Sequence, residues 1–285
     1  MSNLISLFTI LTAMLSIQFG ASIAKKLFPV AGIAGTTMLR VTIAAIILLG
    51  IWKPWKINYT KKNYLIFLGY GISLGAMNLL FYLSLARIPL GIAVALEFTG
   101  PLLLALFSSK RILDILWAIL AGTGVWLILP VGDTAHTLDL TGIVLAILAG
   151  IFWAFYIIFG KASGKNTHSG HATALGMMFA AFVTIPFGIY YNSHEAFQLS
   201  ILPMGILIAI LSSALPYSLE MIAMKNISAK TFGILMSMEP AVASLMGFLF
   251  LKENLTLLQC SAIVCIIIAS AGTALSSKDS REVLN

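Results

Sequence analysis

The hydrophobic residues of this chain gather into ten long runs, which short polar stretches separate. The polar stretches hold lysine, arginine and proline, as between residues 52 and 56. Unpaired backbone groups are very costly in lipid, so continuous apolar runs of about 20 residues predict membrane-spanning helices. The strict alternation expected of membrane-spanning strands is absent. The runs cover residues 4–24, 31–51, 63–85, 90–108, 112–130, 139–160, 171–191, 201–224, 229–251 and 256–276.

The composition supports this pattern. Of the 285 residues, 60% are apolar and 9% are charged, and the mean hydropathy is +1.01. Soluble domains carry about 25% charged residues, so this chain cannot cover a water-facing surface. We therefore predict an all-α polytopic membrane protein with ten transmembrane helices. The first run has no basic segment before it, which indicates a retained helix and not a signal peptide.

The basic residues predict the orientation. If the N-terminus is cytoplasmic, twelve Lys and Arg residues fall in inner loops and four in outer loops, with Arg40 inside a span. Positive charge stays on the cytoplasmic side of a membrane, so both termini are expected there, in a bacterial inner membrane. The basic residues form no clustered patch of the kind that binds a nucleic acid backbone.

The two halves of the chain resemble each other. A shift of 139 positions places Pro101 on Pro240 and Ser73 on Ser212. We interpret residues 1–130 and 139–276 as two five-helix repeats, followed by a short cytoplasmic tail at 277–285. Because five is odd, the second repeat is inverted relative to the first, a plan that recurs in secondary transporters with substrate bound between the repeats.

Charged residues inside apolar runs point to function, because each costs roughly 2.5–3.5 kcal/mol at the centre of a bilayer. Glu97 is followed four residues later by Pro101, which lacks the N–H that would bond the Glu97 carbonyl. A carboxylate and a free carbonyl at one place suit an ammonium group or a proton. A structural Glu97 paired to Arg40 is the alternative.

The run 201–224 carries a polar stripe. Ser213, Tyr217 and Glu220 share one helical face, and Pro216 frees the carbonyl of Ser212. Such a broken polar helix suits the wall of a cavity. Glu220 is equally suited to reach the interface or to pair with Lys225.

Further polar residues lie in other spans. Glu239, next to Pro240, is a candidate proton site, although a packing role is favoured. Arg40 needs an anionic partner, which Glu97, Glu239 or a substrate carboxylate can supply. Asn78, Tyr82 and Gln18 suit hydrogen bonds between helices at least as well as ligand contacts.

Other kinds of site are not indicated. His168 and His171 are three residues apart, but no third metal ligand is evident, so no metal site is expected. The sequence has no nucleotide-binding glycine loop, nucleophile elbow or HExxH motif. We therefore expect no bound cofactor and no enzymatic activity.

Four stretches carry a resemblance to a known family: SIQFGASIAKKLFP (16–29), PLGIAVALEFTGPLLLALFSSKR (89–111), ILPMGILIAILSSALPYSLEMIAM (201–224) and TFGILMSMEPAVASLMGFLFL (231–251). Through them the chain resembles the EamA branch of the drug/metabolite transporter superfamily. The resemblance runs from the first span to the last. It implies ten helices in two inverted repeats, and proton-driven efflux of small neutral amino acids, with threonine and homoserine first.

We hypothesise a role for each candidate residue. Arg40 would bind the substrate carboxylate, directly or by holding a glutamate in place. Glu97 would bind the ammonium group or the coupling proton, and Ser213, Tyr217 and Glu220 would form the cavity wall. Three alternatives stay open: a transporter of another metabolite or drug, a passive amino-acid channel, and a membrane-embedded enzyme. The oligomeric state is not indicated.

Overall fold

The structure, a computed structural model, describes residues 3–107, 112–128, 139–165, 167–191, 198–226 and 236–276. These residues are helical nearly throughout and form no β-strand. Short 3₁₀ turns lie at Pro54–Lys56 and Leu199–Ile201, and a π-helical turn at Ile210–Ala214 joins α9 to α10. The α-helices are α1 (Asn3–Ala31), α2 (Ile33–Trp52), α3 (Lys61–Leu85), α4 (Leu90–Glu97), α5 (Thr99–Phe107), α6 (Ile112–Ile128), α7 (Leu140–Lys165), α8 (Ser169–Tyr190), α9 (Leu202–Ala209), α10 (Leu215–Asn226), α12 (Glu239–Leu251) and α13 (Leu257–Ser276).

Six helical segments are long and apolar enough to cross a membrane, which confirms the predicted all-α multi-pass class. These six are Phe8–Ala31, Ile33–Trp52, Lys61–Leu85, Leu140–Gly164, Ser169–Tyr190 and Leu199–Ala223. Four of the predicted runs are represented by shorter apolar helices in the described residues, namely Leu90–Leu104, Ile115–Leu127, Glu239–Leu251 and Leu257–Ala269.

The first loop is shorter than the sequence predicts. We expected a loop at Lys25, Lys26 and Pro29, but α1 continues through all three residues to Ala31. The turn into α2 is made by Gly32, whose φ of 67° lies in the left-handed region that glycine adopts without strain. Lys25 stays inside the helix because its Nζ reaches Glu253 Oε1 at 2.6 Å, which gives the charge a partner.

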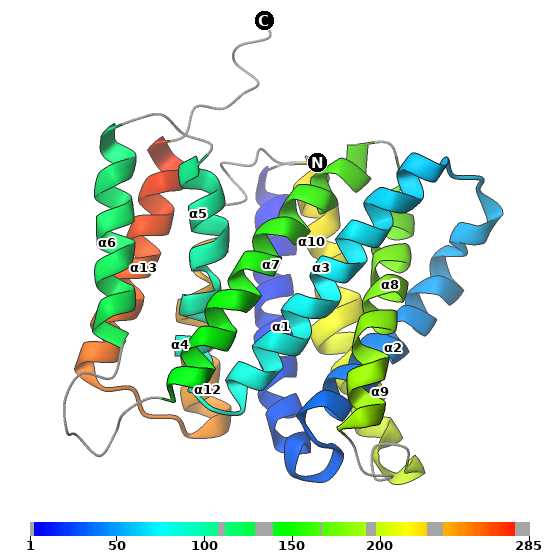
Figure 1. Cartoon of the computed structure of the whole chain (residues 1–285), viewed down its shortest axis with the longest axis horizontal. Helices are drawn as coiled ribbons and strands as arrows, with labels where there is room; N and C mark the ends of the chain where they lie inside the picture. The colour runs from blue at the N-terminus through cyan, green and yellow to red at the C-terminus, as the bar shows by residue number, and fades with distance from the viewer. Residues whose placement is uncertain are drawn as a thin grey trace, which may run out of the picture.

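The helices pack as an upright bundle (Figure 1). Helix α3 lies against both α7 and α8, α2 lies against α8, and α4 lies against α12. At one edge of the bundle, α6 and α13 pair with each other. Helix α1 begins and α13 ends at the same end of the bundle, the upper end in Figure 1.

The interior of the bundle holds polar and charged side chains. Large apolar side chains such as Leu257 and Phe182 face outward, exposed by 85% and 62%. Arginine, glutamate, asparagine and glutamine side chains are buried instead. Close helix contacts rely on small residues: a Cβ on Gly71 of α3 would lie 2.6 Å from the Gly176 carbonyl of α8. This arrangement fits a protein whose outer surface faces lipid and whose interior holds a polar site.

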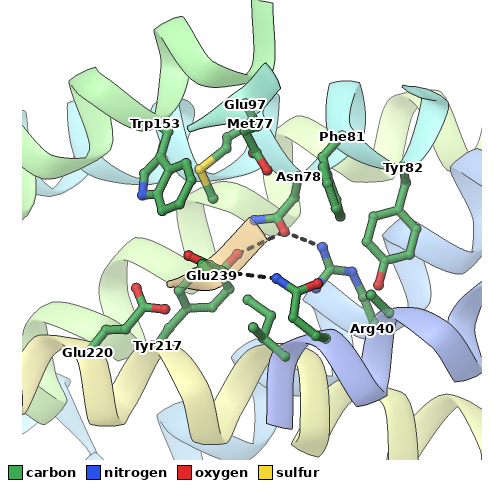
Figure 2. Close-up of a pocket in the computed structure, with 13 residues that line it drawn as sticks. Arg40, Met77, Asn78, Phe81, Tyr82, Glu97, Trp153, Tyr217, Glu220 and Glu239 are labelled. Atoms are coloured by element: carbon green, nitrogen blue, oxygen red, sulfur yellow. Dashed lines mark hydrogen bonds between the residues drawn. The ribbon is translucent and has the colours of Figure 1, made fainter. Parts of the chain in front are cut away.

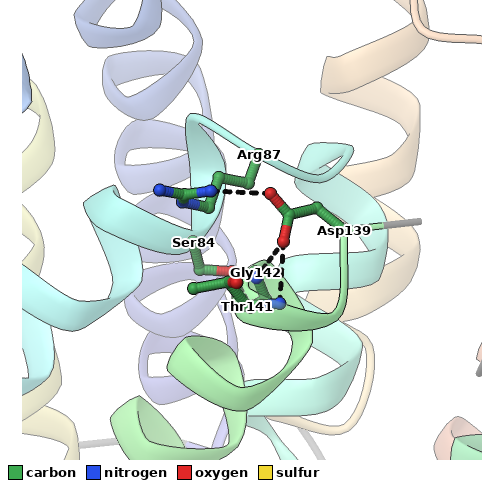
Figure 3. Close-up of polar contacts among 5 residues, drawn as sticks. All are labelled: Ser84, Arg87, Asp139, Thr141 and Gly142. Atoms are coloured by element: carbon green, nitrogen blue, oxygen red, sulfur yellow. Dashed lines mark hydrogen bonds and ion pairs between the residues drawn. The ribbon is translucent and has the colours of Figure 1, made fainter.

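Polar contacts tie the helices together at the end of the bundle where α3 is followed by α4. Arg87 Nη1 lies 2.7 Å from Asp139 Oδ2, and Asp139 Oδ1 accepts from the Thr141 and Gly142 amides at 2.7 and 3.3 Å (Figure 3). The Ser84 hydroxyl donates to the Gly142 carbonyl at 2.8 Å. The Arg87 guanidinium lowers the pKa of the Asp139 carboxyl, and the hydrogen bonds from the two amides lower it by a smaller amount.

Candidate functional site

A buried cavity of about 40 Å³ lies at the centre of the bundle. Eight of the nine side chains predicted for the site line it, and the ninth, Ser213, bonds one of them. A volume of this size holds roughly three water molecules, so the walls must separate before a metabolite can enter. The lining residues are Ile17, Gln18, Ala21, Arg40, Met77, Asn78, Phe81, Tyr82, Glu97, Trp153, Tyr217, Glu220 and Glu239.

Arg40 of α2 is 2% exposed, and its hydrogen-bonded partners are neutral. Its Nη1 donates to the Ser212 carbonyl at 2.8 Å and to the Ser213 hydroxyl at 2.9 Å. Its Nη2 donates to Asn78 Oδ1, and its guanidinium carbon lies 4.2 Å from the centre of the Tyr82 ring. Arg40 forms no ion pair with any carboxylate in the part of the chain that the structure describes. The alternative in which Glu97 is a structural partner of Arg40 is therefore not seen, and the positive charge remains available to a ligand.

The partners of Arg40 exist because α9 and α10 do not form one regular helix. Pro216 has no N–H to donate to the turn before it. A π-helical turn precedes this proline, and in it Leu215 N donates to Ile210 O, five residues earlier. Two carbonyls near this turn are satisfied from other helices: Ser16 Oγ donates to Leu211 O at 2.6 Å, and Arg40 donates to Ser212 O. The prediction that Pro216 frees the Ser212 carbonyl is confirmed, and Arg40 is the donor that the carbonyl receives.

Asn78 of α3 connects Arg40 to the second half of the chain. Its Oδ1 accepts from Arg40 and, at 3.0 Å, from the Tyr217 hydroxyl, while its Nδ2 donates to the Leu74 carbonyl at 2.7 Å. These contacts leave the amide with little freedom to turn, and they hold the guanidinium in a fixed orientation (Figure 2). Asn78 and Tyr217 therefore position Arg40, in addition to lining the cavity.

Glu97 is the last residue of α4, and Phe98, which follows it, keeps a helical backbone (φ −65°, ψ −16°) before α5 begins at Thr99. Pro101 lies in the first turn of α5, so the Glu97 carbonyl has no N–H four residues later to bond. That carbonyl packs against α7, since a Cβ on Gly150 would lie 2.4 Å from it. The carbonyl therefore faces the α7 backbone, contrary to its predicted use as a ligand, whereas the Glu97 side chain lines the cavity.

Glu220 and Glu239 complete the acidic lining. Glu220 is 3% exposed and accepts from the Tyr156 hydroxyl at 3.2 Å, so it lies in the interior and not at the interface. The side chain of Lys225, its predicted alternative partner, lies outside the described residues. Glu239 accepts from Gln18 Nε2 at 3.0 Å. Pro240 lies in the first turn of α12, which begins at Glu239, and the missing N–H of a proline interrupts no hydrogen bond within α12 itself.

Comparison with known proteins identifies the family. Residues 140–275 match the EamA-like transporter family. Over 274 residues the chain is 48% identical to the threonine/homoserine exporter RhtA of Escherichia coli strain K12, covering 96% of this chain and 92% of the relative. This chain belongs to the EamA-like transporter family.

Two further matches agree with this membership. The threonine/homoserine exporter RhtA of Salmonella typhimurium strain LT2 is 49% identical over 267 residues, which cover 94% of this chain and 90% of the relative. A crystal structure that is 15% identical in sequence superposes with a TM-score of 0.63, covering 97% of this chain and 99% of the other. The second match bears on the fold alone.

The sequence did not indicate the apolar residues that line the cavity. Met77, Phe81 and Trp153 line the cavity beside the polar groups. Large apolar residues in a membrane helix resemble ordinary packing, so no local signal separates them from the rest of the core. Tyr156 was missed for the same reason, although the hydroxyl of a buried tyrosine usually has a polar partner.

The charges in the cavity do not balance. Three carboxyl groups, on Glu97, Glu220 and Glu239, share it with one guanidinium. Buried charge without a partner is strongly unfavourable, so the cavity is best satisfied when it takes up protons or a positively charged group. The arrangement can therefore bind a cation, a proton or a zwitterion.

Proposed function

We propose that this protein exports small neutral amino acids, threonine and homoserine first, across the bacterial inner membrane in exchange for protons. The observation that carries the proposal is the Arg40 guanidinium, buried among neutral partners in a cavity that also holds three carboxyl groups. A zwitterion supplies both missing partners, because its carboxylate suits Arg40 and its ammonium suits a glutamate. The relatives named threonine/homoserine exporter support this choice of cargo.

In the proposed mechanism, Arg40 binds the substrate carboxylate, and Glu97 binds the ammonium group or the coupling proton. Ser213 and Tyr217 act mainly by holding Arg40 and its neighbour Asn78 in place. Glu220 contributes to the wall. The two halves of the bundle rock about the cavity, and protonation from the outer side releases the substrate if one carboxylate serves both ligands.

The proposal includes ten transmembrane helices in two inverted repeats, 1–130 and 139–276, with both termini and the tail 277–285 cytoplasmic. The helix contacts support it. If the two halves are repeats, α1 corresponds to α7, α2 to α8 and α3 to α9–α10. The contact between α3 and α7 should then have a counterpart between α1 and α10, and the contact between α2 and α8 should be its own counterpart. Both contacts occur in the structure. Asn78 and Tyr217, which are 139 positions apart, bond each other, as residues beside a twofold axis would.

Counterflow in proteoliposomes tests the function. Vesicles containing purified protein are loaded with unlabelled threonine, and uptake of labelled threonine is followed with and without an imposed pH gradient. Trans-stimulated uptake that responds to the gradient is expected from the wild type. Glu97→Gln should lose binding or proton coupling, whereas Asp139→Asn, which neutralises a carboxylate outside the cavity, should retain both.

The two transport alternatives, a passive channel and a transporter of another cargo, predict different results in this assay. A passive channel would give flux that is insensitive to the pH gradient and no counterflow. A transporter of another metabolite or drug would show no threonine or homoserine counterflow in folded protein. Full proton-coupled transport by Glu97→Gln would remove Glu97 from the mechanism.

A further inference from the structure

Gln18 and Glu239 form a buried pair that the mechanism above leaves without a role. Gln18 lies on α1 and Glu239 is the first residue of α12, and the two side chains are 3% and 4% exposed. Gln18 Nε2 donates to Glu239 Oε1 at 3.0 Å, and both residues line the cavity. The charge of the carboxylate fixes the amide, because turning it over would bring two oxygen atoms together.

Each member of the pair keeps one oxygen atom without a partner. Gln18 Oε1 and Glu239 Oε2 are both buried, and neither accepts a hydrogen bond from the residues that the structure describes. Most buried polar atoms in proteins are hydrogen-bonded, and leaving one unpaired costs about 1–3 kcal/mol. Two unpaired acceptors, one of them on a carboxylate, therefore indicate a donor group that is bound only part of the time.

The cavity also has two hydrogen-bond donors without a partner among the described residues, and neither belongs to Gln18 or Glu239. Arg40 Nε and the Tyr82 hydroxyl are also buried, and neither has a hydrogen-bond partner in the described part of the chain. Figure 2 shows Arg40 and Tyr82 together at one edge of the cavity, with Glu239 nearer the opposite edge. The unpaired donors of the cavity therefore come from α2 and α3, and the unpaired acceptors come from α1 and α12. A free α-amino acid carries a carboxylate for the first set and an ammonium group for the second.

We infer that the Gln18–Glu239 pair binds the α-ammonium group of the substrate and makes the transporter selective for α-amino acids over analogues without the amine. An ammonium group has three N–H donors, enough to satisfy both unpaired oxygens. Glu220 suits this role less well, because one of its oxygens accepts from Tyr156 and neither oxygen is both buried and unpaired among the described residues. Glu97, whose carboxylate accepts no hydrogen bond from the residues the structure describes, is then left to carry the coupling proton.

This inference rests on the proposed function, and a competition assay tests it. Uptake of labelled threonine by counterflow is inhibited with unlabelled threonine or with 2,3-dihydroxybutyrate, in which a hydroxyl replaces the α-amine. The measured quantity is the ratio of the two inhibition constants. Wild-type protein should prefer threonine strongly, because only the ammonium satisfies a charged acceptor.

Two variants probe the pair. Glu239→Gln keeps an oxygen for Gln18 Nε2 and removes the charge, so the protein should stay folded while the preference for threonine falls about tenfold or more. Gln18→Met removes the amide at similar volume and should reduce the preference in the same direction. Glu220→Gln is the matched control, a carboxyl of the same cavity whose loss should leave the ratio unchanged even if uptake slows.

The outcomes separate the two claims. A wild type without threonine counterflow would refute the proposed function and this assignment with it. A wild type that transports threonine, with an unchanged ratio in both Glu239→Gln and Gln18→Met, would refute the assignment alone. A merely structural role of the pair would lower the affinity for both competitors equally and would also overturn it.

Discussion

The close approach of α1 to the π-helical turn makes Gly20 a sensitive position. A Cβ at Gly20 would lie 2.7 Å from Ser212 Cβ and 2.8 Å from Ser212 N. Backbone atoms cannot move aside as a flexible side chain does, so Gly20→Ala must push α1 away from the turn. The same displacement would disturb the Ser212 carbonyl that accepts from Arg40.

Two opposing effects set the magnitude. Replacing glycine by alanine inside a helix stabilises it by about 1 kcal/mol. Overpacking a tight contact costs roughly 1–3 kcal/mol. Gly50 of α2 is exposed, and a Cβ there would meet nothing within 4 Å, so Gly50→Ala reports the first effect alone. The difference between the two variants therefore isolates the contact, at about 1–3 kcal/mol.

Thermal unfolding of the purified proteins in detergent measures this difference. At 2–4 °C per kcal/mol, Gly20→Ala should unfold roughly 2–12 °C below Gly50→Ala. Adding Ser212→Gly to Gly20→Ala should restore part of the loss, because it removes one of the two clashing atoms and leaves the other. Equal melting temperatures for Gly20→Ala and Gly50→Ala would show that α1 does not approach the turn this closely, and the description of the Arg40 site would fail with it.

Two further predictions concern the polar contacts at the α3–α4 end of the bundle. Because Arg87 lowers the pKa of Asp139, their ion pair stabilises the folded protein above the unfolded pKa of about 3.9 and ceases to do so as the pH falls through the lowered value. Arg87→Gln should therefore melt below wild type at pH 7, by a difference that shrinks as the pH falls below the unfolded pKa; a difference that does not change with pH would contradict this. Glu253 Oε2 accepts from the Leu90 amide at 2.8 Å and so caps α4, while Oε1 holds Lys25. Glu253→Ala should lose about 0.5–2 kcal/mol by thermal unfolding and Glu253→Gln less, because glutamine still accepts from the amide; equal losses would exclude the cap.

Much of the fold follows from hydropathy, but the ends of the helices do not. The apolar runs locate the six long spans because lipid leaves the backbone no other arrangement. The loop predicted at Lys25 was wrong. A lysine next to an apolar run indicates the end of a membrane helix unless a residue that pairs with its charge is known. Glu253, the partner here, is 228 residues away. Local sequence does not carry that information.

The site shows the same division. Pro216 predicts a free carbonyl from covalent chemistry alone, and the structure confirms it. We expected Arg40 to pair with a carboxylate, but it donates to this carbonyl instead. That contact depends on how α2 packs against the π-helical turn, and the local sequence does not show such packing.

The small cavity and the broken helices have one explanation if the cavity must open during transport. A volume of about 40 Å³ does not hold an amino acid, so binding must move the walls. Rigid helices resist bending because each turn shares its hydrogen bonds with the next. The α4–α5 break at Phe98 and the π-helical turn beside Pro216 have already given up regular hydrogen bonds, and they lie next to Glu97 and Arg40. Motion at these two places would therefore disrupt few further backbone bonds, and it would change the distance between the groups that we propose bind the proton and the substrate carboxylate.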